Sequence, residues 1–344
     1  MTRLEDVLIA PSGLTAFGPG GSVADQAHAL LLQQRAEFAL ARDGYASLGR
    51  VQVRQFDFDG FAVQLQCNPA RMRSSAARVD AHSVGARPCF LCVANLPAGQ
   101  RGLRYGDDYL ILANPYPVAP EHLTIPALIH TPQRLRGALG TLLSLACDLS
   151  PRYTIVYNGP QCGASAPDHL HFQAVPAGFL PLDRDFEQLA ARHGTHVRPA
   201  AGPDAGDGPQ VRATVFATLA CRCVALEGDD PEALADSVGR LLAVLVDLVP
   251  GDGEPMVNLI VRYYGSWRVV VVPRTRHRPS TYPTGDGEGI LLSPASVDLG
   301  GVCITPRAQD FQRLQPEQLL AIFAEVGLGR EAMLQLSGHL AMAL

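Results

Sequence analysis

The chain has 344 residues, of which 47% are hydrophobic and 18% are charged, a composition typical of a globular protein with a sizeable core. Its length predicts two packed domains or one large duplicated fold. The net charge of −5 argues against a nucleic-acid partner and against a basic membrane-binding face. All 28 basic residues are arginine, which excludes P-loop and Schiff-base mechanisms because both need a lysine. An anionic substrate must therefore be held by arginines, backbone amides or helix N-termini.

Hydrophobic periodicity predicts the elements of the first half. In chain order they are a helix over 24–44, a hairpin over 51–69, two strands in 109–126, a helix over 131–149 and a strand–loop–strand unit over 152–175. The Asp59–Gly60 pair is typical of a hairpin turn, and Thr131 is expected to cap the second helix.

The second half repeats the first in outline. Segments 109–132 and 257–280 each hold two predicted strands, a proline, a histidine four residues later and a second proline. This match predicts a degenerate internal duplication. Residues 199–210 are mostly Gly, Pro and Ala, and we expect them to link an N-terminal catalytic half (1–198) to a degenerate second half (211–344).

The N-terminal stretch MTRLEDVLIAPSG carries charges and lacks the apolar run of a secretory signal. The most apolar helical stretch, 239–251, is interrupted by Asp247 and is too short to span a bilayer. Without a signal, the eight cysteines are expected to be thiols or metal ligands rather than disulfides. These features predict a cytoplasmic protein with no membrane partner, and they leave a homodimer open.

The strongest chemical signal is HLHFQ at 169–173, in which polar and apolar side chains alternate strictly. In a β-strand this alternation places His169, His171 and Gln173 on one face. A neutral imidazole is a nucleophile toward phosphorus or a metal ligand, and the alternative without function is a polar niche in the core. The preceding segment, 157–167, is rich in small residues that let backbone amides approach a ligand closely. Loop and strand together favour a phosphate held beside a nucleophile.

The segment GPQCGASAPDHLHFQ resembles the active-site segment of the histidine-triad superfamily, in the branch with glutamine in the third place. That branch includes galactose-1-phosphate uridylyltransferases, dinucleoside-polyphosphate phosphorylases and GDP-hexose phosphorylases. The resemblance is specific over 86–176. It implies an α+β, duplicated histidine-triad-like fold with antiparallel sheets and flanking helices.

The resemblance also implies roles for single residues. His171 would be the nucleophile that accepts a nucleoside monophosphate, Gln173 would hydrogen-bond the phosphoryl oxygens, and His169 would ligate zinc or orient its neighbour. Between Ser165 and His169 the chain has one residue more than the uridylyltransferase pattern. Substrate contacts are expected in the glycine-bearing loop and in an arginine cluster of the second half, with a plain Asn-Gly turn and a solvated arginine face as the alternatives. The candidates are Asn158, Gly159, Gly163, Ser165, Arg274 and Arg276.

A zinc site is also expected. Cys89 and Cys92 have the spacing of half a tetrahedral site, with a redox pair as the alternative. His130 and His169 are placed like the other two ligands of the zinc-bearing uridylyltransferases, and His122 is the second candidate for the fourth position. The zinc would be structural and would pre-organise the nucleophile. Mg²⁺ is left open as a second metal, although no cluster of carboxylates in the sequence indicates a site for it.

The sequence therefore predicts a nucleotidyltransferase or phosphorylase. A nucleotide sugar (NDP-hexose) or a dinucleoside polyphosphate would transfer its nucleotidyl group through His171 to inorganic phosphate or to a sugar phosphate. Three alternatives remain: a histidine-triad-type hydrolase, a non-catalytic zinc-stabilised nucleotide-binding module, and an RNA-end or dinucleotide repair enzyme. The acidic net charge argues against the last.

Overall fold

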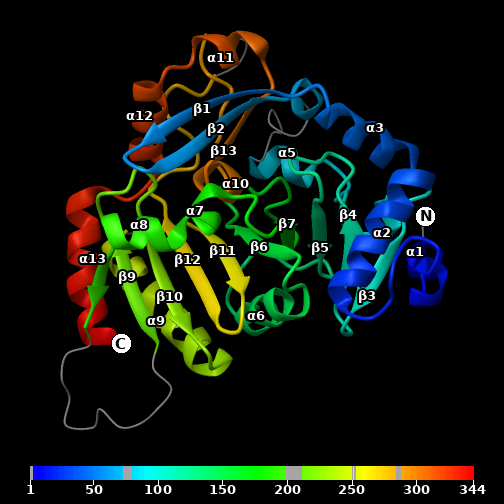
Figure 1. Cartoon of the computed structure of the whole chain (residues 1–344), viewed down its shortest axis with the longest axis horizontal. Coiled ribbons are helices and arrows are strands. Elements are labelled where there is room, and N and C mark those ends of the chain that lie inside the picture. Colours follow the sequence, from blue (N-terminus) through cyan, green and yellow to red (C-terminus); the bar gives the residue numbers. More distant parts are fainter. Residues whose placement is uncertain (1–2, 73–79, 199–210, 250, 252, 284–287) are drawn as a thin grey trace.

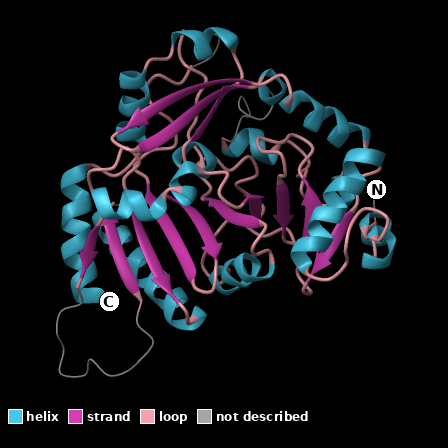
Figure 2. Cartoon of the chain, viewed as in Figure 1, coloured by secondary structure: helices cyan, strands magenta, loops and turns pink. Residues whose placement is uncertain are grey.

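The computed structural model describes residues 3–72, 80–198, 211–249, 251, 253–283 and 288–344. Among these residues, ten antiparallel strands form one sheet in the order β3-β4-β5-β7-β6-β11-β12-β10-β9-β8 (Figures 1 and 2). Its strands are β3 (Gly102–Tyr105), β4 (Tyr109–Ala113), β5 (Leu123–Pro126), β6 (Tyr153–Asn158), β7 (His171–Pro176), β8 (Thr195–Val197), β9 (Arg212–Phe216), β10 (Cys223–Gly228), β11 (Val257–Tyr263) and β12 (Trp267–Pro273). The expected linker, 199–210, lies outside the described residues.

The strand order shows that the fold is duplicated. β4-β5-β7-β6 on one side of the sheet corresponds to β9-β10-β12-β11 on the other. Helix α6 (Leu139–Asp148) is inserted between β5 and β6, and α9 (Pro231–Leu248) is inserted at the equivalent point between β10 and β11. The two repeats meet where β6 pairs with β11 and Asn158 lies opposite Asn258. The predicted duplicated α+β fold with antiparallel sheets and flanking helices is confirmed.

The two segments that suggested the duplication are not equivalent, however. Segment 109–132 contains β4 and β5, whereas 257–280 contains β11 and β12, which correspond to β6 and β7. Both segments are a pair of buried adjacent strands followed by a proline-rich exit. Any pair of adjacent strands that is buried on both faces has such an apolar sequence. The pattern therefore indicates a buried strand pair, and it does not identify equivalent positions in the two repeats.

Side chains of each strand alternate between two apolar cores. One core lies beneath the helices α2 (Val23–Glu37), α6, α9 and α13 (Arg330–Ala343), and it includes Leu30, Leu142, Leu241 and Leu336. The other lies on the opposite face, beneath a three-stranded sheet of β1 (Gln52–Phe58), β2 (Phe61–Cys67) and β13 (Val302–Thr305) that we call the cap sheet (Figure 1). β13 runs parallel to β2, so segments from both ends of the chain build the cap.

The space between the cap sheet and the ten-stranded sheet differs between the two repeats. Over the second repeat, Phe61, Val63 and Leu65 of β2 join one apolar cluster with Val270 and Val272 of β12, so the sheet face is filled. Over the first repeat, the same face opens into a cavity. The remaining elements are α1 (Leu4–Val7), α3 (Ala39–Leu48), α5 (Ala81–Gly85), α7 (Pro181–Arg184), α8 (Phe186–His193), α10 (Ser296–Leu299), α11 (Ala308–Arg313), α12 (Pro316–Val326) and 3-10 turns at Pro11–Leu14, Pro69–Arg71 and Val93–Asn95.

The hairpin predicted from its turn residues is confirmed, whereas the two helices predicted from periodicity have different bounds. The hairpin turns as expected at Asp59 and Gly60, which have φ of 57° and 88°. The helix expected over 24–44 is broken at Phe38, whose backbone is extended and whose ring is buried in the helix-side core. The helix expected over 131–149 begins only at Leu139, and Thr131 does not cap it.

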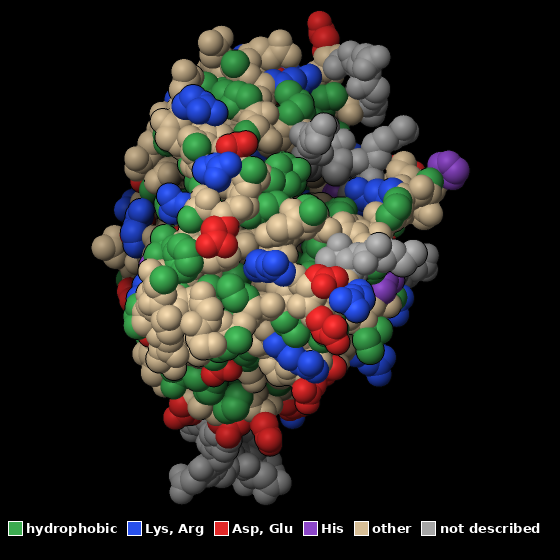
Figure 3. All heavy atoms as spheres, turned by 90° about the vertical axis from the view of Figure 1, so that its right-hand side faces the viewer, with side chains coloured by type: hydrophobic (Ala, Val, Ile, Leu, Met, Phe, Trp, Pro, Cys, Tyr) green, Lys and Arg blue, Asp and Glu red, His purple; other side chains and the backbone are tan. Residues whose placement is uncertain are grey.

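The outer surface carries mixed charge. Figure 3 shows the face that bears α1 to α3, where basic and acidic side chains are interspersed among apolar ones. Among the described residues, no helix combines the length and apolar character needed to cross a membrane.

Candidate active site and metal centre

The HLHFQ motif straddles the start of β7. From His171 onward the predicted alternation is confirmed, because Phe172 and Ala174 enter the helix-side core while His171 and Gln173 line the cavity. His169 does not lie on the strand. It sits in the bend before β7, and its ring faces Cys89 and not the cavity.

The ring of His171 is held in one tautomer. Its Nδ1 lies 2.8 Å from the carbonyl oxygen of His169 and must donate to it, because a carbonyl only accepts. Nε2 therefore keeps its lone pair, and no group within the described part of the chain forms a hydrogen bond with it. Burial lowers the pKa of His171 to about 4, so the ring is neutral near pH 7.

Gln133 holds the backbone of His171, and sequence reasoning missed it. Its Nε2 donates to the carbonyls of Asn158 (2.9 Å) and His171 (3.0 Å), and its Oε1 accepts the N–H of His171 at 2.7 Å. The side chain is fully buried. Residues 131–138 therefore run as a loop that fastens β7 to β6, which explains why the expected helix starts late.

A cavity of about 410 Å³ lies between the first repeat and the cap sheet. His171 and Gln173 form part of its floor, and α10 and β13 close it from the C-terminal side. Its polar and charged lining consists of Arg71, Arg87, Asn95, Gln100, Asn114, Tyr116, His122, Thr124, Asn158, Ser165, His171, Gln173 and Asp298. Its volume and mixed lining are those of a small-molecule site.

The glycine-bearing loop places three of its four predicted residues at the cavity: Asn158, Gly163 and Ser165. The Oδ1 of Asn158 accepts from Asn258 (2.7 Å) and from the N–H of Ser296 (2.8 Å), so its amino group remains to face a ligand. Gly159 lies outside the lining. A Cβ there would be 2.9 Å from the carbonyl oxygen of Val257, so this glycine permits the close approach of β11.

Gly163→Ala is expected to cost about 1–3 kcal/mol of unfolding free energy. Gly163 has φ of +93°, and an added Cβ would lie 2.6 Å from the Cβ of Ala295. Equilibrium urea denaturation checks this, and Gly140→Ala, which meets nothing within 4 Å inside α6, is the matched control. An unchanged midpoint for Gly163→Ala would contradict the strained geometry.

The arginines at the cavity are not those singled out from the sequence. Arg274 is fully buried and donates to carbonyls and to Oδ1 of Asn258, which in turn contacts Asn158. Arg276 is exposed and pairs with Glu325. Arg71 and Arg87 line the cavity instead, and neither forms an ion pair within the described residues.

Arg71 and Arg87 differ in what they contact. One nitrogen of Arg71 donates to the carbonyl of Tyr116 at 2.5 Å, and its Nε is buried without an acceptor. Arg87 donates to the carbonyl of Ser165 at 2.6 Å and lies over the ring of Phe90. The sequence offers one signal that could have identified these two arginines, which is their position. Arg71 follows the hairpin, and Arg87 comes just before the cysteine pair.

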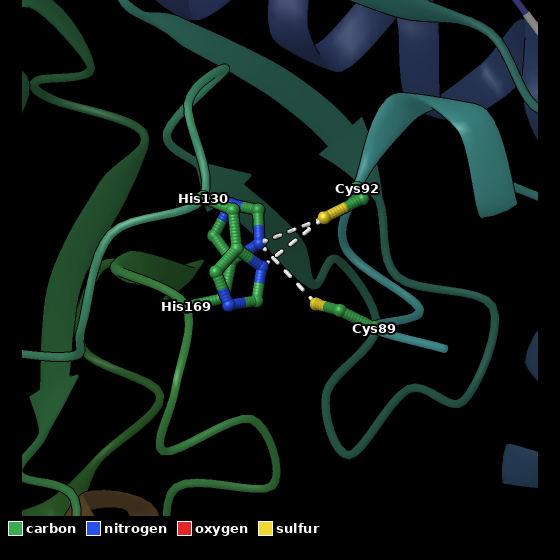
Figure 4. Close-up of side chains that lie close together, drawn as sticks. All are labelled: Cys89, Cys92, His130 and His169. Atoms are coloured by element: carbon green, nitrogen blue, oxygen red, sulfur yellow. Dashed lines mark hydrogen bonds between the residues drawn. The ribbon is translucent and has the colours of Figure 1, made fainter. Parts of the chain in front are cut away.

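The predicted ligand set meets at one point. The sulfur atoms of Cys89 and Cys92 face the rings of His130 and His169, and the four ligand atoms lie within 4.8 Å of one another (Figure 4). Nδ1 of His169 is 3.3 Å from Cys89 Sγ, and Nδ1 of His130 is 3.2 Å from Cys92 Sγ. His122, the alternative ligand, lies elsewhere and contacts Gln173.

The geometry and chemistry of these donors fit a zinc ion. Tetrahedral zinc places nitrogen and sulfur ligands roughly 3.6 Å apart, close to the separations found here. Nε2 of His169 contacts the carbonyl of Ala127 at 2.7 Å, and Nε2 of His130 is 3.4 Å from a carboxylate oxygen of Asp168. Such outer partners orient ligating imidazoles. The cluster can therefore bind a metal such as zinc.

Comparison with known proteins shows the fold. Residues 30–176 match a family model described as a domain of unknown function, DUF4922. A search of curated proteins finds no match. Yeast Ap4A phosphorylase Apa2 is similar in structure, with a TM-score of 0.52 and 19% identity over 84% of this chain and 93% of that chain. Its complex with Ap4A gives a TM-score of 0.54 and 16% identity over 86% and 98%. The fold is that of the yeast phosphorylase.

Proposed function

We propose that this protein is a nucleotidyl-transferring enzyme of the phosphorylase type. Its substrate would be a dinucleoside polyphosphate or a nucleotide sugar, and the acceptor would be inorganic phosphate or a sugar phosphate. The observation that carries the proposal is the Nε2 lone pair of His171, which belongs to a neutral imidazole lining a cavity with two arginines. The similarity in fold to an Ap4A phosphorylase supports the reaction class.

The reaction proceeds in two displacements at the α-phosphorus. In the first, the Nε2 lone pair of His171 forms a P–N bond, the P–O bond to the leaving group breaks, and that group departs as a phosphate anion. The Nδ1 proton stays on the ring and continues to donate to the carbonyl of His169. In the second, an oxygen of the acceptor phosphate forms a P–O bond, the P–N bond breaks, and the electron pair returns to Nε2.

Groups around His171 stabilise the charge on the phosphoryl oxygens. The amino groups of Gln173 and Asn158 are donors at the floor of the cavity, and Arg87 brings a positive charge beside Ser165. Cys89, Cys92, His130 and His169 would hold zinc, which when bound supplies a rigid link between the 89–92 turn and the start of β7.

The leaving group would bind beneath the cap sheet, between Arg71 and Asp298. Both line the cavity, and they do not form an ion pair with each other. The carboxylate of Asp298 accepts two backbone N–H groups, and burial raises its pKa to about 6. A cation and a carboxylate held apart in one cavity suit a ligand with both a phosphate and hydroxyl groups.

Arg71→Gln is expected to raise KM for the nucleotide about 10- to 100-fold, because it removes a charge-assisted hydrogen bond to the leaving phosphate. Steady-state kinetics with the best substrate check this. Arg50→Gln, at an exposed arginine remote from the cavity lining, is the matched control. Equal KM values for the two variants would remove Arg71 from the proposed subsite.

The proposal as a whole is tested with a panel of nucleotide sugars and dinucleoside polyphosphates, each with and without inorganic phosphate. The expected result is a nucleoside diphosphate that forms only with phosphate, and a protein mass increased by one nucleotidyl group when acceptor is omitted. Release of nucleoside monophosphate without phosphate would make the protein a hydrolase. Binding without any product would make it a nucleotide-binding module.

A further inference from the structure

His122 is held in a single tautomer by its two ring contacts. Its Nδ1 lies 3.4 Å from the backbone nitrogen of Val118, whose N–H can only donate. The proton of the neutral ring must then be on Nε2, which lies 2.8 Å from Oε1 of Gln173 and donates to it. Complete burial and the charge of Arg71 lower the pKa of His122 to about 3, which keeps the ring neutral.

This contact decides which end of the Gln173 amide faces a substrate. With Oε1 engaged by His122, the amino group is the end left for the cavity, which Gln173 lines. An amide turned by 180° would present Oε1, an acceptor, to phosphoryl oxygens that are also acceptors. The amino group would attract the negative charge that develops on the phosphoryl oxygens, whereas Oε1 would repel it.

Helix α3 fixes His122 from behind. The Tyr45 hydroxyl accepts the backbone N–H of His122 at 3.1 Å and donates to its carbonyl at 3.0 Å. Tyr45 can reach this point because α3 lies against the loop that follows β4. At Gly44 an added Cβ would be 2.1 Å from the carbonyl oxygen of Pro115. The helix thus carries the hydroxyl to the backbone that bears the imidazole.

We propose that His122 is a positioning residue that orients the Gln173 amide as a hydrogen-bond donor to the phosphoryl group, and that Tyr45 holds His122 in place. The inference rests on the proposed function for its catalytic consequence. The hydrogen-bond arrangement itself is independent of that function.

The test is a double-mutant cycle on the rate of nucleotidyl-enzyme formation in single turnover. His122→Phe keeps an aromatic ring but removes the donor, and it is expected to slow this step about 10- to 100-fold with little change in nucleotide Kd. In the Gln173→Ala background the same substitution should have no further effect, because its target is gone. Equal losses in both backgrounds would show that His122 acts only through general stability and would overturn the inference.

Two further measurements keep the result interpretable. His122→Gln can again offer an amide N–H to Gln173, so it is expected to recover the rate to within about fivefold of wild type. Nitrogen-15 spectra of histidine-labelled protein identify the His122 ring as the signal that is lost in both His122 variants. That ring should be protonated at Nε2 and unprotonated at Nδ1. A His122 ring protonated at Nδ1 would overturn the inference even if no nucleotide reacts, whereas absence of any nucleotidyl-enzyme in wild type would count against the proposed function alone.

Discussion

His171→Asn is expected to lower turnover by about 10⁴-fold or more while leaving the fold and the candidate metal centre intact. The amino group of asparagine occupies nearly the same place as Nδ1 of histidine, so the bond to the His169 carbonyl can be kept. The atom that we propose attacks phosphorus, Nε2, is absent. The variant therefore removes the chemistry and preserves the contact that supports β7.

The measurement combines initial rates with intact-protein mass after incubation with nucleotide and no acceptor. Wild type should gain the mass of one nucleotidyl group and His171→Asn should gain none. His339→Asn, the same change at an exposed histidine on α13, should behave as wild type. Retained turnover in His171→Asn, with its melting temperature unchanged, would place the nucleophile elsewhere.

Loss of the metal is expected to have the second-largest effect, because it acts on both stability and activity. Cys92→Ser, or removal of metal by a chelator, should lower the unfolding free energy by about 4 kcal/mol or more. Activity should fall as well, since His169 belongs to the candidate ligand set and its carbonyl also holds the ring of His171. Phe90 and Leu91, which lie between the two cysteines, line the cavity and would lose their anchor.

Metal content by atomic absorption and thermal unfolding followed through Trp267, the single tryptophan, check this prediction. Cys147→Ser is the matched control, because Cys147 is a half-buried thiol outside the ligand cluster. Its metal content and melting temperature should equal those of wild type. If purified protein contains no metal and a chelator changes neither stability nor activity, the cluster has no structural role as a metal site.

Part of the site was predictable because it depends on local pattern. Strict alternation in HLHFQ places His171 and Gln173 on one face of any strand, whatever surrounds it. The Cys-x-x-Cys spacing sets two sulfur ligands side by side before the rest of the fold is known. The hairpin at Asp59 and Gly60 follows from the ease with which those residues adopt positive φ.

Other parts could not be read from local pattern. Gln133 lies in a segment with helical periodicity, yet contacts with β6 and β7, 25 and 38 residues away, hold it in a loop. The arginine cluster near residue 274 is typical of an anion site. Burial of Arg274 among carbonyls occupies its donors, while Arg71 and Arg87 are the pair that lines the cavity.

The amino-acid sequence alone determined the chemistry available to this protein: an imidazole and an amide on one strand face, a Cys-and-His ligand set, and no lysine. Tertiary structure decided which of these groups meet and in which protonation state. Tyr45 and His122 are 77 residues apart, and Asn158 and Ser296 are 138 apart. Such contacts depend on how the repeats and the cap sheet pack together, because tautomers and amide orientations are set by partners that no local period encodes.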